Sequence, residues 1–249
     1  MPRRHGTAAE RIDAMNGQEA MAARHAVRDY ADSPVDEGTL LALREAIERA
    51  NEEGDLNIQL IHDETDAFGG CPTHYGRFKG VRYCIALIGP DAADRCGRGL
   101  DERVGYYGES LALKAVTLGL STSWVVLHDT ETHGTWRIAD GERMPAAIAF
   151  GHGAREGRPH RSKSAELLGA VESGTLETAP DWFAHGLAAV QLAPSALGKQ
   201  PFRFTLLADG HTVRAEALEG LQSEICLGIA KLHFELGAGA GNFAWQARG

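Results

Sequence analysis

Two arginines, Arg24 and Arg28, stand four positions apart in a stretch that reads RHAVRDY. Residues with this spacing lie on one face of a helical turn, so their guanidinium groups would converge there. Paired planar donors of this kind suit a phosphate or the polar edge of a flat heterocycle. The alternative interpretation is a solvated basic stripe that pairs with Asp29 or Asp32.

A second stretch, residues 193–201, reads APSALGKQP and ends a helical pattern. Proline and the residue before it resist helical geometry, so the last carbonyl and neighbouring amide groups lose their intrahelical partners. Such backbone groups can hydrogen-bond the polar edge of a heterocycle. A plain proline-rich helix exit is the alternative.

Positive charge gathers in a third stretch, which follows an apolar run at 146–150. Its members are Arg155, Arg158, His160, Arg161 and Lys163. A local concentration of cations in an acidic chain suits a phosphate group, and a solvated loop is the alternative.

Other kinds of site have weaker support. The chain has 11 histidines, but none forms an HExxH or HxH pattern, so a histidine-based metallohydrolase is only a remote alternative. Residues 108–111 lack the elbow of a serine nucleophile. The glycine-rich run 237–241 follows a helical pattern instead of a strand, which argues against a dinucleotide loop. We expect no metal ligands and no catalytic side chain.

Composition excludes several classes of protein. The chain has 249 residues, of which 43% are hydrophobic and 24% charged, as in an ordinary globular protein. Its formal net charge of −9 argues against non-specific nucleic-acid binding. No signal peptide and no apolar run of membrane-spanning length is present. We expect a cytoplasmic protein without nucleic-acid or membrane partners.

The elements that would position these stretches follow from hydrophobic periodicity and capping residues. Asn16 is expected to cap a first helix, and Asp181 a later one. Apolar faces are expected from Leu40, Leu41, Leu43, Ala46 and Ile47, and from Leu111, Leu113, Ala115 and Leu118. The predicted helices lie in 16–23, after 33–36, and in 105–120, 181–192 and 225–236; the predicted strands are 57–61, 83–88, 123–127, 146–150, 202–207, 212–217 and 242–245.

Two internal similarities indicate a degenerate duplication. Residues 46–61 resemble 189–204, and the helical stretch 109–120 resembles 227–238. The matching stretches keep their order, although the second copy is shorter between them. Chance likeness of amphipathic helices is the alternative. The predicted organisation is a flexible tail 1–15, a first half 16–165 and a shortened second half 166–249.

Together these stretches resemble the FMN-dependent nitroreductase family. Residues 24–30 resemble its RxSxRxY/F motif, and residues 193–204 resemble its APSxxNxQPW/FRF motif. Residues 105–124 resemble its core helix and following strand, and 148–163 its closing strand and basic phosphate arm. The resemblance covers about 17–245.

The order of the motifs departs from that of ordinary members. We call residues 24–30 the arginine motif and residues 193–204, which form the Pro-Ser loop, the Pro-Ser motif. In ordinary members the Pro-Ser motif soon follows the arginine motif, and each flavin site of the obligate homodimer takes one motif from each chain. Here the early slot holds residues 50–54, ANEEG, and the Pro-Ser motif occurs only in the second copy. This order resembles a subfamily in which two half-nitroreductases are fused, so that one chain mimics the dimer.

The resemblance implies an α+β, nitroreductase-like fold with mainly antiparallel sheets wrapped by helices in two pseudo-symmetric halves. It also implies roles: Arg24 holds the FMN phosphate, and Arg28 lies near N1/O2 of the ring. Residues 124–126 pass beneath the ring, 194–196 line it, and Arg161 and Lys163 close on the phosphate. The implied FMN-binding residues are Arg24, His25, Ala26, Arg28, Trp124, Val125, Val126, Arg161, Lys163, Pro194, Ser195 and Ala196.

The implied activity is that of an FMN oxidoreductase, which takes hydride from NAD(P)H and reduces a small nitroaromatic or quinone-like acceptor. Two departures, Ala26 for the usual Ser and Gly198 for the usual Asn, remove flavin contacts. They leave open the alternative of a non-catalytic flavin- or ligand-binding protein. Complementary loss of the two motifs predicts at most one FMN per chain, in a particle that can be monomeric.

Overall fold

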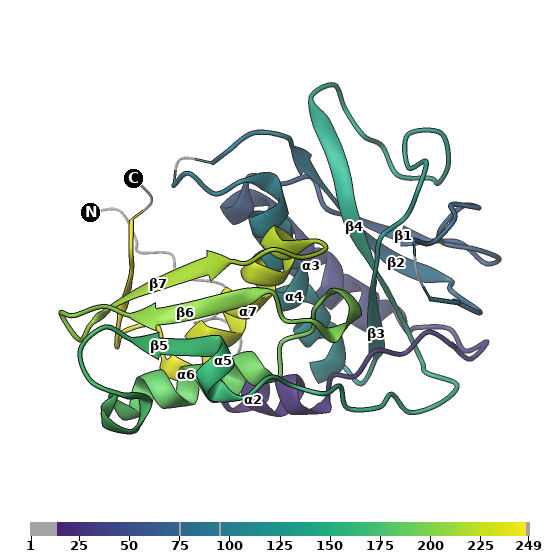
Figure 1. The fold of residues 1–249 in the computed structure, drawn as a ribbon. Coiled ribbons are helices and arrows are strands. Elements are labelled where there is room, and N and C mark those ends of the chain that lie inside the picture. Colours follow the sequence, from purple (N-terminus) through teal and green to yellow (C-terminus); the bar gives the residue numbers. More distant parts are fainter. Residues whose placement is uncertain (1–13, 75, 95, 248–249) are drawn as a thin grey trace. The chain divides into compact units, whose positions relative to one another are not determined.

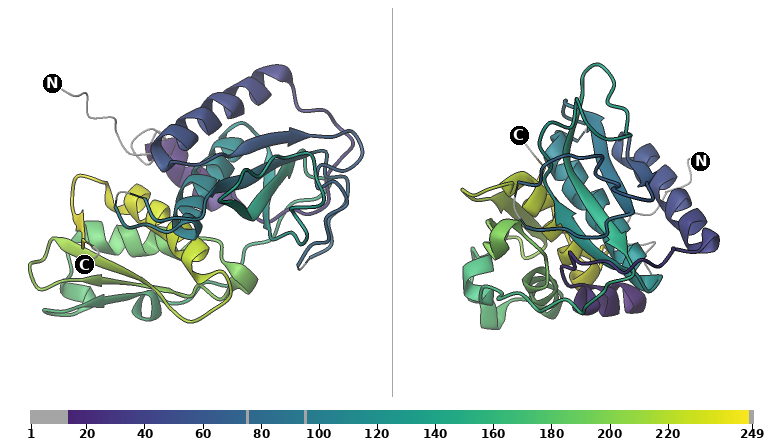
Figure 2. Two further views of the ribbon diagram at one scale, coloured as in Figure 1. Left: turned by 90° about the horizontal axis from the view of Figure 1, so that it is seen from above. Right: turned by 90° about the vertical axis from the view of Figure 1, so that its right-hand side faces the viewer.

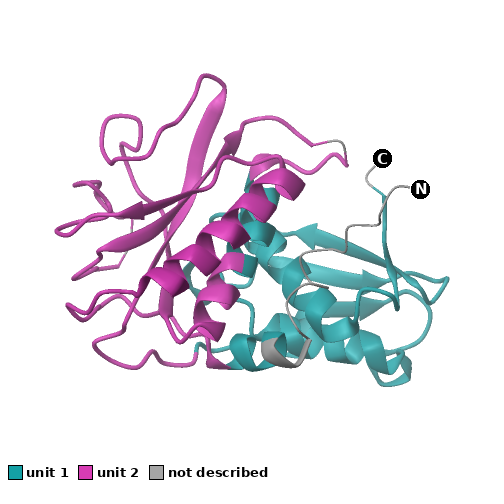
Figure 3. Ribbon diagram, turned by 180° about the vertical axis from the view of Figure 1, so that it is seen from behind, with its two compact units in different colours: residues 1–22, 101–110, 160–249 teal, residues 23–100, 111–159 magenta. Residues whose placement is uncertain are grey.

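The computed structural model describes residues 14–74, 76–94 and 96–247 (Figure 1). Most of the predicted tail 1–15 lies outside the described residues. The chain divides into two compact units (Figure 3). Unit 1 takes its residues from segments 1–22, 101–110 and 160–249, and unit 2 from 23–100 and 111–159. Neither unit is continuous in sequence. Within helix α4 (Leu100–Thr117), residues 101–110 belong to unit 1 and the others to unit 2.

Unit 2 is built on an antiparallel sheet with the strand order β1-β2-β4-β3. The strands are β1 (Gln59–His62), β2 (Tyr83–Pro90), β3 (Ser121–Val125) and β4 (Glu142–Gly151). The two central strands, β2 and β4, are almost entirely buried, because both faces of the sheet are covered. Their apolar, partly β-branched runs suit such a position.

One face of this sheet forms a core with loops. The alternating side chains of Cys84, Ala86 and Ile88 pack there with Phe68 and Trp136, which come from the connections between strands. Helix α3 (Glu37–Gly54) runs along the sheet beside β1 (Figure 2). It begins where the Asp36 carboxylate accepts the Thr39 backbone N–H at 2.9 Å.

Unit 1 contains a mixed sheet with the strand order β5-β6-β7-β8. The antiparallel pair β6–β7 lies between the parallel pairs β5–β6 and β7–β8. Among the described residues, unit 1 contains residues 101–110 of α4 and ten further elements. These are α2 (Ala14–Ala23, up to residue 22), α5 (Ala165–Leu168), β5 (Gly169–Val171), η1 (Leu176–Thr178), α6 (Asp181–Gln191), η2 (Ala196–Gly198), β6 (Phe202–Leu206), β7 (Thr212–Ala217), α7 (Ser223–Ala238) and β8 (Ala244–Trp245).

Helix α7 is the centre of unit 1. It packs against α6 and against strands β6 and β7. Phe234 in α7 stacks on Phe204 of β6, with ring centroids 5.0 Å apart. On another side, α7 meets residues 101–110 of α4 closely enough that a Cβ at Gly228 would lie 2.0 Å from the Glu102 carbonyl oxygen.

Most predicted elements are confirmed, and several boundaries are corrected. Helix α2 begins two residues before Asn16, so Asn16 does not cap it. Asp181 is the first residue of α6, and its cap position is Pro180. Leu41 is exposed on α3, and Leu118 lies just beyond α4. No helix among the described residues is long and apolar enough to cross a membrane.

Candidate functional site

The arginine motif is an extended segment instead of a helical turn, which corrects the geometry expected for Arg24 and Arg28. Helix α2 ends at Ala23, and the Val27 amide then donates to the Thr122 carbonyl of β3 at 3.0 Å. Further along, the Tyr30 amide donates to the Lys79 carbonyl at 3.0 Å. These backbone bonds to two other segments of unit 2 fix the path of the motif.

Apolar residues of the motif anchor it in the core of unit 2. Val27 and Tyr30 are buried, and the Tyr30 hydroxyl donates to the Ala149 carbonyl of β4 at 2.9 Å. Burial raises the pKa of Tyr30 far above its usual range, so the hydroxyl stays protonated and remains a donor.

The side chains expected to bind the cofactor differ in exposure. Arg24 is buried, His25 and Arg28 are half-buried, and Ala26 is exposed. The Nε atom of Arg28 is buried without a hydrogen-bond partner among the described residues. Its guanidinium lies 5.9 Å from the centroid of the Phe78 ring. Arg28 therefore keeps a donor available for a ligand.

Strand β3, which meets this motif at Thr122, also carries Trp124 and Val125. Trp124 pairs with Ile148 and Val125 with Ala147 of β4, and Val125 is fully buried. The carbonyl of Val126 accepts the His74 amide at 2.8 Å. On the same strand, the buried Thr122 hydroxyl has no hydrogen-bond partner in the part of the chain that the structure describes.

The basic stretch 155–163 begins next to the arginine motif. Gly157 packs so closely on His25 that a Cβ there would lie 2.4 Å from the His25 Cβ. Arg155 Nε lies 3.9 Å from the Asp29 carboxylate, and both side chains are substantially exposed. The structure thus brings the arginine motif and the first part of this stretch together.

The Pro-Ser loop in unit 1 is organised by Gln200, a residue to which the sequence analysis gave no role. Gln200 is fully buried. Its side-chain amide donates to the carbonyls of Gln191 at 3.1 Å and Ala193 at 3.4 Å, which follow the last helical hydrogen bonds of α6. The Gln200 backbone amide donates to the Ser195 hydroxyl at 2.8 Å. The carbonyls expected to be free at this helix exit are therefore satisfied.

Gln200 also positions Lys163 of the basic stretch. Its side-chain oxygen accepts the Lys163 amide at 2.7 Å, and its backbone carbonyl accepts the Lys163 ammonium at 2.9 Å. Arg161 is exposed, and Pro194 and Ser195 are half-buried. The amide of buried Ala196 donates to the Cys226 thiol at 3.4 Å. Burial raises the pKa of this thiol, so it is held in the neutral form.

The predicted binding residues therefore form two groups. Those of the arginine motif and β3 belong to unit 2, and 161–163 with 194–196 belong to unit 1. That both groups hold one flavin stays a prediction. In the unit 2 group, Arg28 Nε and Thr122 Oγ1 are buried without hydrogen-bond partners among the described residues, so this group offers donors to a ligand with a polar edge. No cluster of metal-ligating side chains occurs among the described residues.

The sequence matches a family model described as "Putative TM nitroreductase" over residues 16–238. The chain belongs to this nitroreductase family. The match includes both the arginine motif and the Pro-Ser motif. No curated protein matched the sequence.

One solved structure supports the nitroreductase fold, and two further ones are similar over part of the chain. A Thermotoga maritima protein described as a "putative nitroreductase" aligns over 100% of this chain and 95% of its own, with 20% identity and a TM-score of 0.55. A Clostridium difficile protein described as an FMN-dependent nitroreductase aligns over 56% and 88%, with 16% identity and a TM-score of 0.45. A Desulfovibrio desulfuricans protein of the nitroreductase description, solved in complex with FMN, aligns over 61% and 94%, with 21% identity and a TM-score of 0.47.

Proposed function

We propose that this nitroreductase-family protein is an FMN-dependent NAD(P)H oxidoreductase that reduces a small nitroaromatic or quinone-like acceptor. The observation that carries the proposal is the family match over residues 16–238, which includes both motifs expected to bind the flavin. Bound FMN would supply the redox chemistry, namely acceptance of a hydride from NAD(P)H at N5 and delivery of electrons to the acceptor. The chain's own residues would bind and orient the reactants.

Arg28 is proposed to face the N1/O2 edge of the flavin ring. Its buried, unpartnered Nε atom is a donor that a ring oxygen or nitrogen can satisfy. A fixed guanidinium at this edge stabilises the negative charge that develops on the ring. Arg24, which is buried at the start of the same extended segment, is proposed to hold the phosphate.

The second group of residues is proposed to supply the other side of the flavin site. Gln200 holds the Ser195 hydroxyl and the Lys163 ammonium through direct hydrogen bonds. These two groups are therefore fixed before any ligand binds, which lowers the entropy that binding must overcome. Arg161 and Lys163 would add positive charge near the phosphate.

The first test is the identity and behaviour of the bound group. We expect the purified protein to be yellow, to release FMN on denaturation, and to lose its visible flavin absorption when NADH or NADPH is added without oxygen. The absorption should return when a nitroaromatic or a quinone is added. Failure of the protein to bind FMN, even after incubation with an excess, would contradict the proposal.

Arg28→Ala tests the assignment of the ring edge. We expect weaker FMN binding and a lower flavin reduction potential, because a charge-assisted contact worth about 1–3 kcal/mol is lost. Arg24→Ala should weaken FMN binding but spare riboflavin, which has no phosphate. Arg49→Ala, which removes an exposed arginine of α3, is the matched control. Unchanged affinity and potential in Arg28→Ala would refute the assignment.

A non-catalytic flavin- or ligand-binding protein is the second candidate. It is favoured by Ala26 and Gly198, which stand where the resembled motifs have Ser and Asn. This candidate predicts a flavin that binds but is not bleached by either nicotinamide nucleotide. The anaerobic bleaching experiment therefore separates the two functions.

A further inference from the structure

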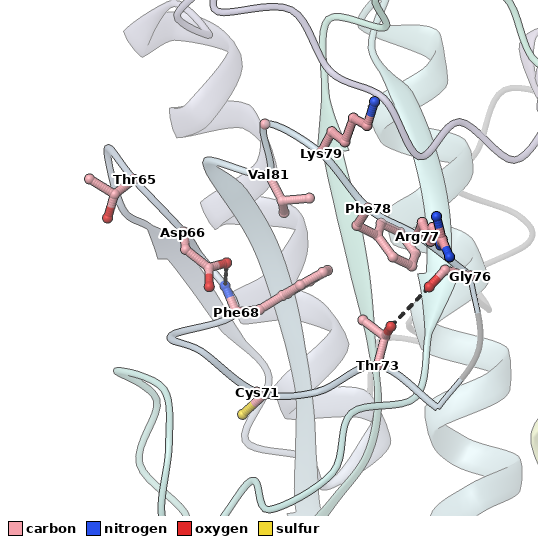
Figure 4. A pocket seen from close by; sticks show the side chains of 11 residues that line it. Thr65, Asp66, Phe68, Cys71, Thr73, Gly76, Arg77, Phe78, Lys79 and Val81 are labelled. Carbon is pink, nitrogen blue, oxygen red and sulfur yellow. Dashed lines mark hydrogen bonds between the residues drawn. The ribbon is translucent and has the colours of Figure 1, made fainter.

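A cavity of about 570 Å³ lies in unit 2 next to Arg28, and its lining contains none of the residues assigned above to the flavin (Figure 4). One chain segment, the connection from β1 to β2, supplies its whole lining. The lining residues are Thr65, Asp66, Phe68, Cys71, Thr73, Gly76, Arg77, Phe78, Lys79, Gly80 and Val81. The volume is in the usual range for a small-molecule site.

The connection that carries this cavity is unusually long. It runs from residue 63 to 82, whereas 207–211 suffice for the corresponding connection between β6 and β7. Loops longer than about 12–15 residues without regular structure are commonly functional. At the start of the connection, the Thr65 hydroxyl donates a hydrogen bond to the Asp63 carboxylate. This bond lowers the pKa of Asp63 to about 2. The Ala67 amide donates to the Val81 carbonyl at 2.8 Å, which closes the loop.

The inner wall of the cavity is aromatic and apolar. The rings of Phe68 and Phe78 meet edge to face, with centroids 5.3 Å apart. Phe68 and Val81 are buried in the core of unit 2, so this wall is fixed. In Figure 4 these three side chains point toward one another, while Lys79 extends outward. A flat ring is the ligand shape that such a wall accommodates.

The charged groups at the cavity are unbalanced. Arg77 and Lys79 are exposed, and neither forms an ion pair with a described residue. The single carboxylate of the lining, Asp66, is engaged with the loop backbone, where it accepts the amides of Phe68 and Gly70, each at 2.9 Å. The Arg28 guanidinium, 5.9 Å from the Phe78 ring centroid, adds a third positive charge next to the lining. The cavity is therefore locally basic in a chain with a net charge of −9.

We propose that this cavity is a binding subsite for aromatic compounds that carry an anionic group such as a carboxylate. The ring would pack on Phe68 and Phe78, and the anion would lie at Arg77 and Lys79. As an acceptor subsite, this inference rests on the proposed function, because it names the class of acceptor. As a binding site, it stands on the cavity alone.

Calorimetric titration of the protein as purified tests the subsite with three probes of one shape and different charge: p-nitrobenzoate, p-nitrobenzyl alcohol and p-nitrobenzylamine. We expect p-nitrobenzoate to bind best, and the double variant Arg77→Gln/Lys79→Gln to weaken its binding about tenfold while leaving the alcohol unchanged. The control is Arg49→Gln/Arg137→Gln, which removes two exposed arginines elsewhere in unit 2. It should leave all three affinities unchanged.

The flavin content of the same samples is also measured, so that failure of the proposed function can be distinguished from failure of the subsite. A flavin-free protein that still prefers p-nitrobenzoate in the expected way would overturn the proposed function and support the subsite. A flavin-containing protein in which the alcohol binds as tightly as the benzoate would overturn the subsite and leave the proposed function standing. Equal loss of benzoate binding in both double variants would also overturn the subsite, since it would reflect net charge only.

Discussion

Gln200 connects the end of α6, Ser195 and Lys163 through hydrogen bonds of its side chain and backbone. One buried amide side chain satisfies carbonyls at the end of α6 and accepts the Lys163 amide. Its backbone adds bonds to Ser195 and to the Lys163 ammonium. Its backbone has a positive φ of 44°, a conformation that residues with side chains adopt rarely.

Replacement of this residue tests its role. Gln200→Ala should lower the free energy of unfolding by about 2–3 kcal/mol, because it leaves buried carbonyls and an amide without partners. Chemical unfolding of wild type and variant measures the change. Gln18→Ala, on the exposed side of α2, is the control and should change stability by less than about 0.5 kcal/mol. A Gln200→Ala protein as stable as the control would show that the network contributes little.

The sequence identified the Pro-Ser loop at residue scale but missed the residue that organises it. Gln200 lies inside the quoted motif, and a buried amide that turns back onto a helix end leaves no periodic signal. For the arginine motif, a helical turn was predicted, and this was wrong because the segment after Ala23 is extended. An extended segment held by β3 has hydrogen-bond partners nearly one hundred positions away, such as Thr122, which local patterns cannot reveal.

At the scale of elements, unit 1 depends on how closely α7 approaches the first part of α4. Gly105 and Gly228 allow the contact, since a Cβ at Gly105 would lie 2.1 Å from the Ile225 carbonyl oxygen. Two polar side-chain pairs between α4 and α7 lie near this contact. Lys231 bonds to Glu102 at 2.8 Å, and the fully buried His233 lies 3.0 Å from the Glu109 carboxylate. Loss of one partner of such a buried pair would leave the other without compensation.

Gly228→Ala tests this close contact. The added methyl group would lie 2.0 Å from a backbone oxygen, so the helices must move apart. We expect a loss of about 1–3 kcal/mol in unfolding free energy, despite the better helix propensity of alanine. Gly241→Ala, where nothing lies within 4 Å of the new Cβ, is the matched control. If thermal unfolding gave the same midpoint for both variants, the close packing would be wrong.

Element boundaries were predicted less well than the elements themselves. Helix α4 was expected over 105–120, whereas it spans Leu100–Thr117 and Gly105 lies at its contact with α7. The strongly apolar strands β2 and β4 were predicted well. The short elements α5 and β5 were missed, since β5 depends on parallel pairing with β6, more than thirty positions further along the chain.

At the scale of the whole molecule, the duplication stays a prediction, and the order of elements is the feature to compare with it. The series α3-β1-β2-α4 and α6-β6-β7-α7 each contain an antiparallel strand pair between two helices. The early slot expected for a Pro-Ser motif, residues 50–54, is the last turn of α3 instead. There the Asn51 side chain bonds to both backbone groups of Ile58, at 3.0 Å and 2.7 Å. That this slot holds no second flavin stays a prediction.

Native mass spectrometry of the protein saturated with FMN tests the central claim most directly, because it reports flavin count and chain count together. The account predicts a 26.7 kDa chain that carries a single FMN, with NAD(P)H bleaching of the same sample. A particle in which flavin is present only on dimers would contradict the single-chain site. Two flavins per chain, or none at saturating FMN, would contradict the account as a whole.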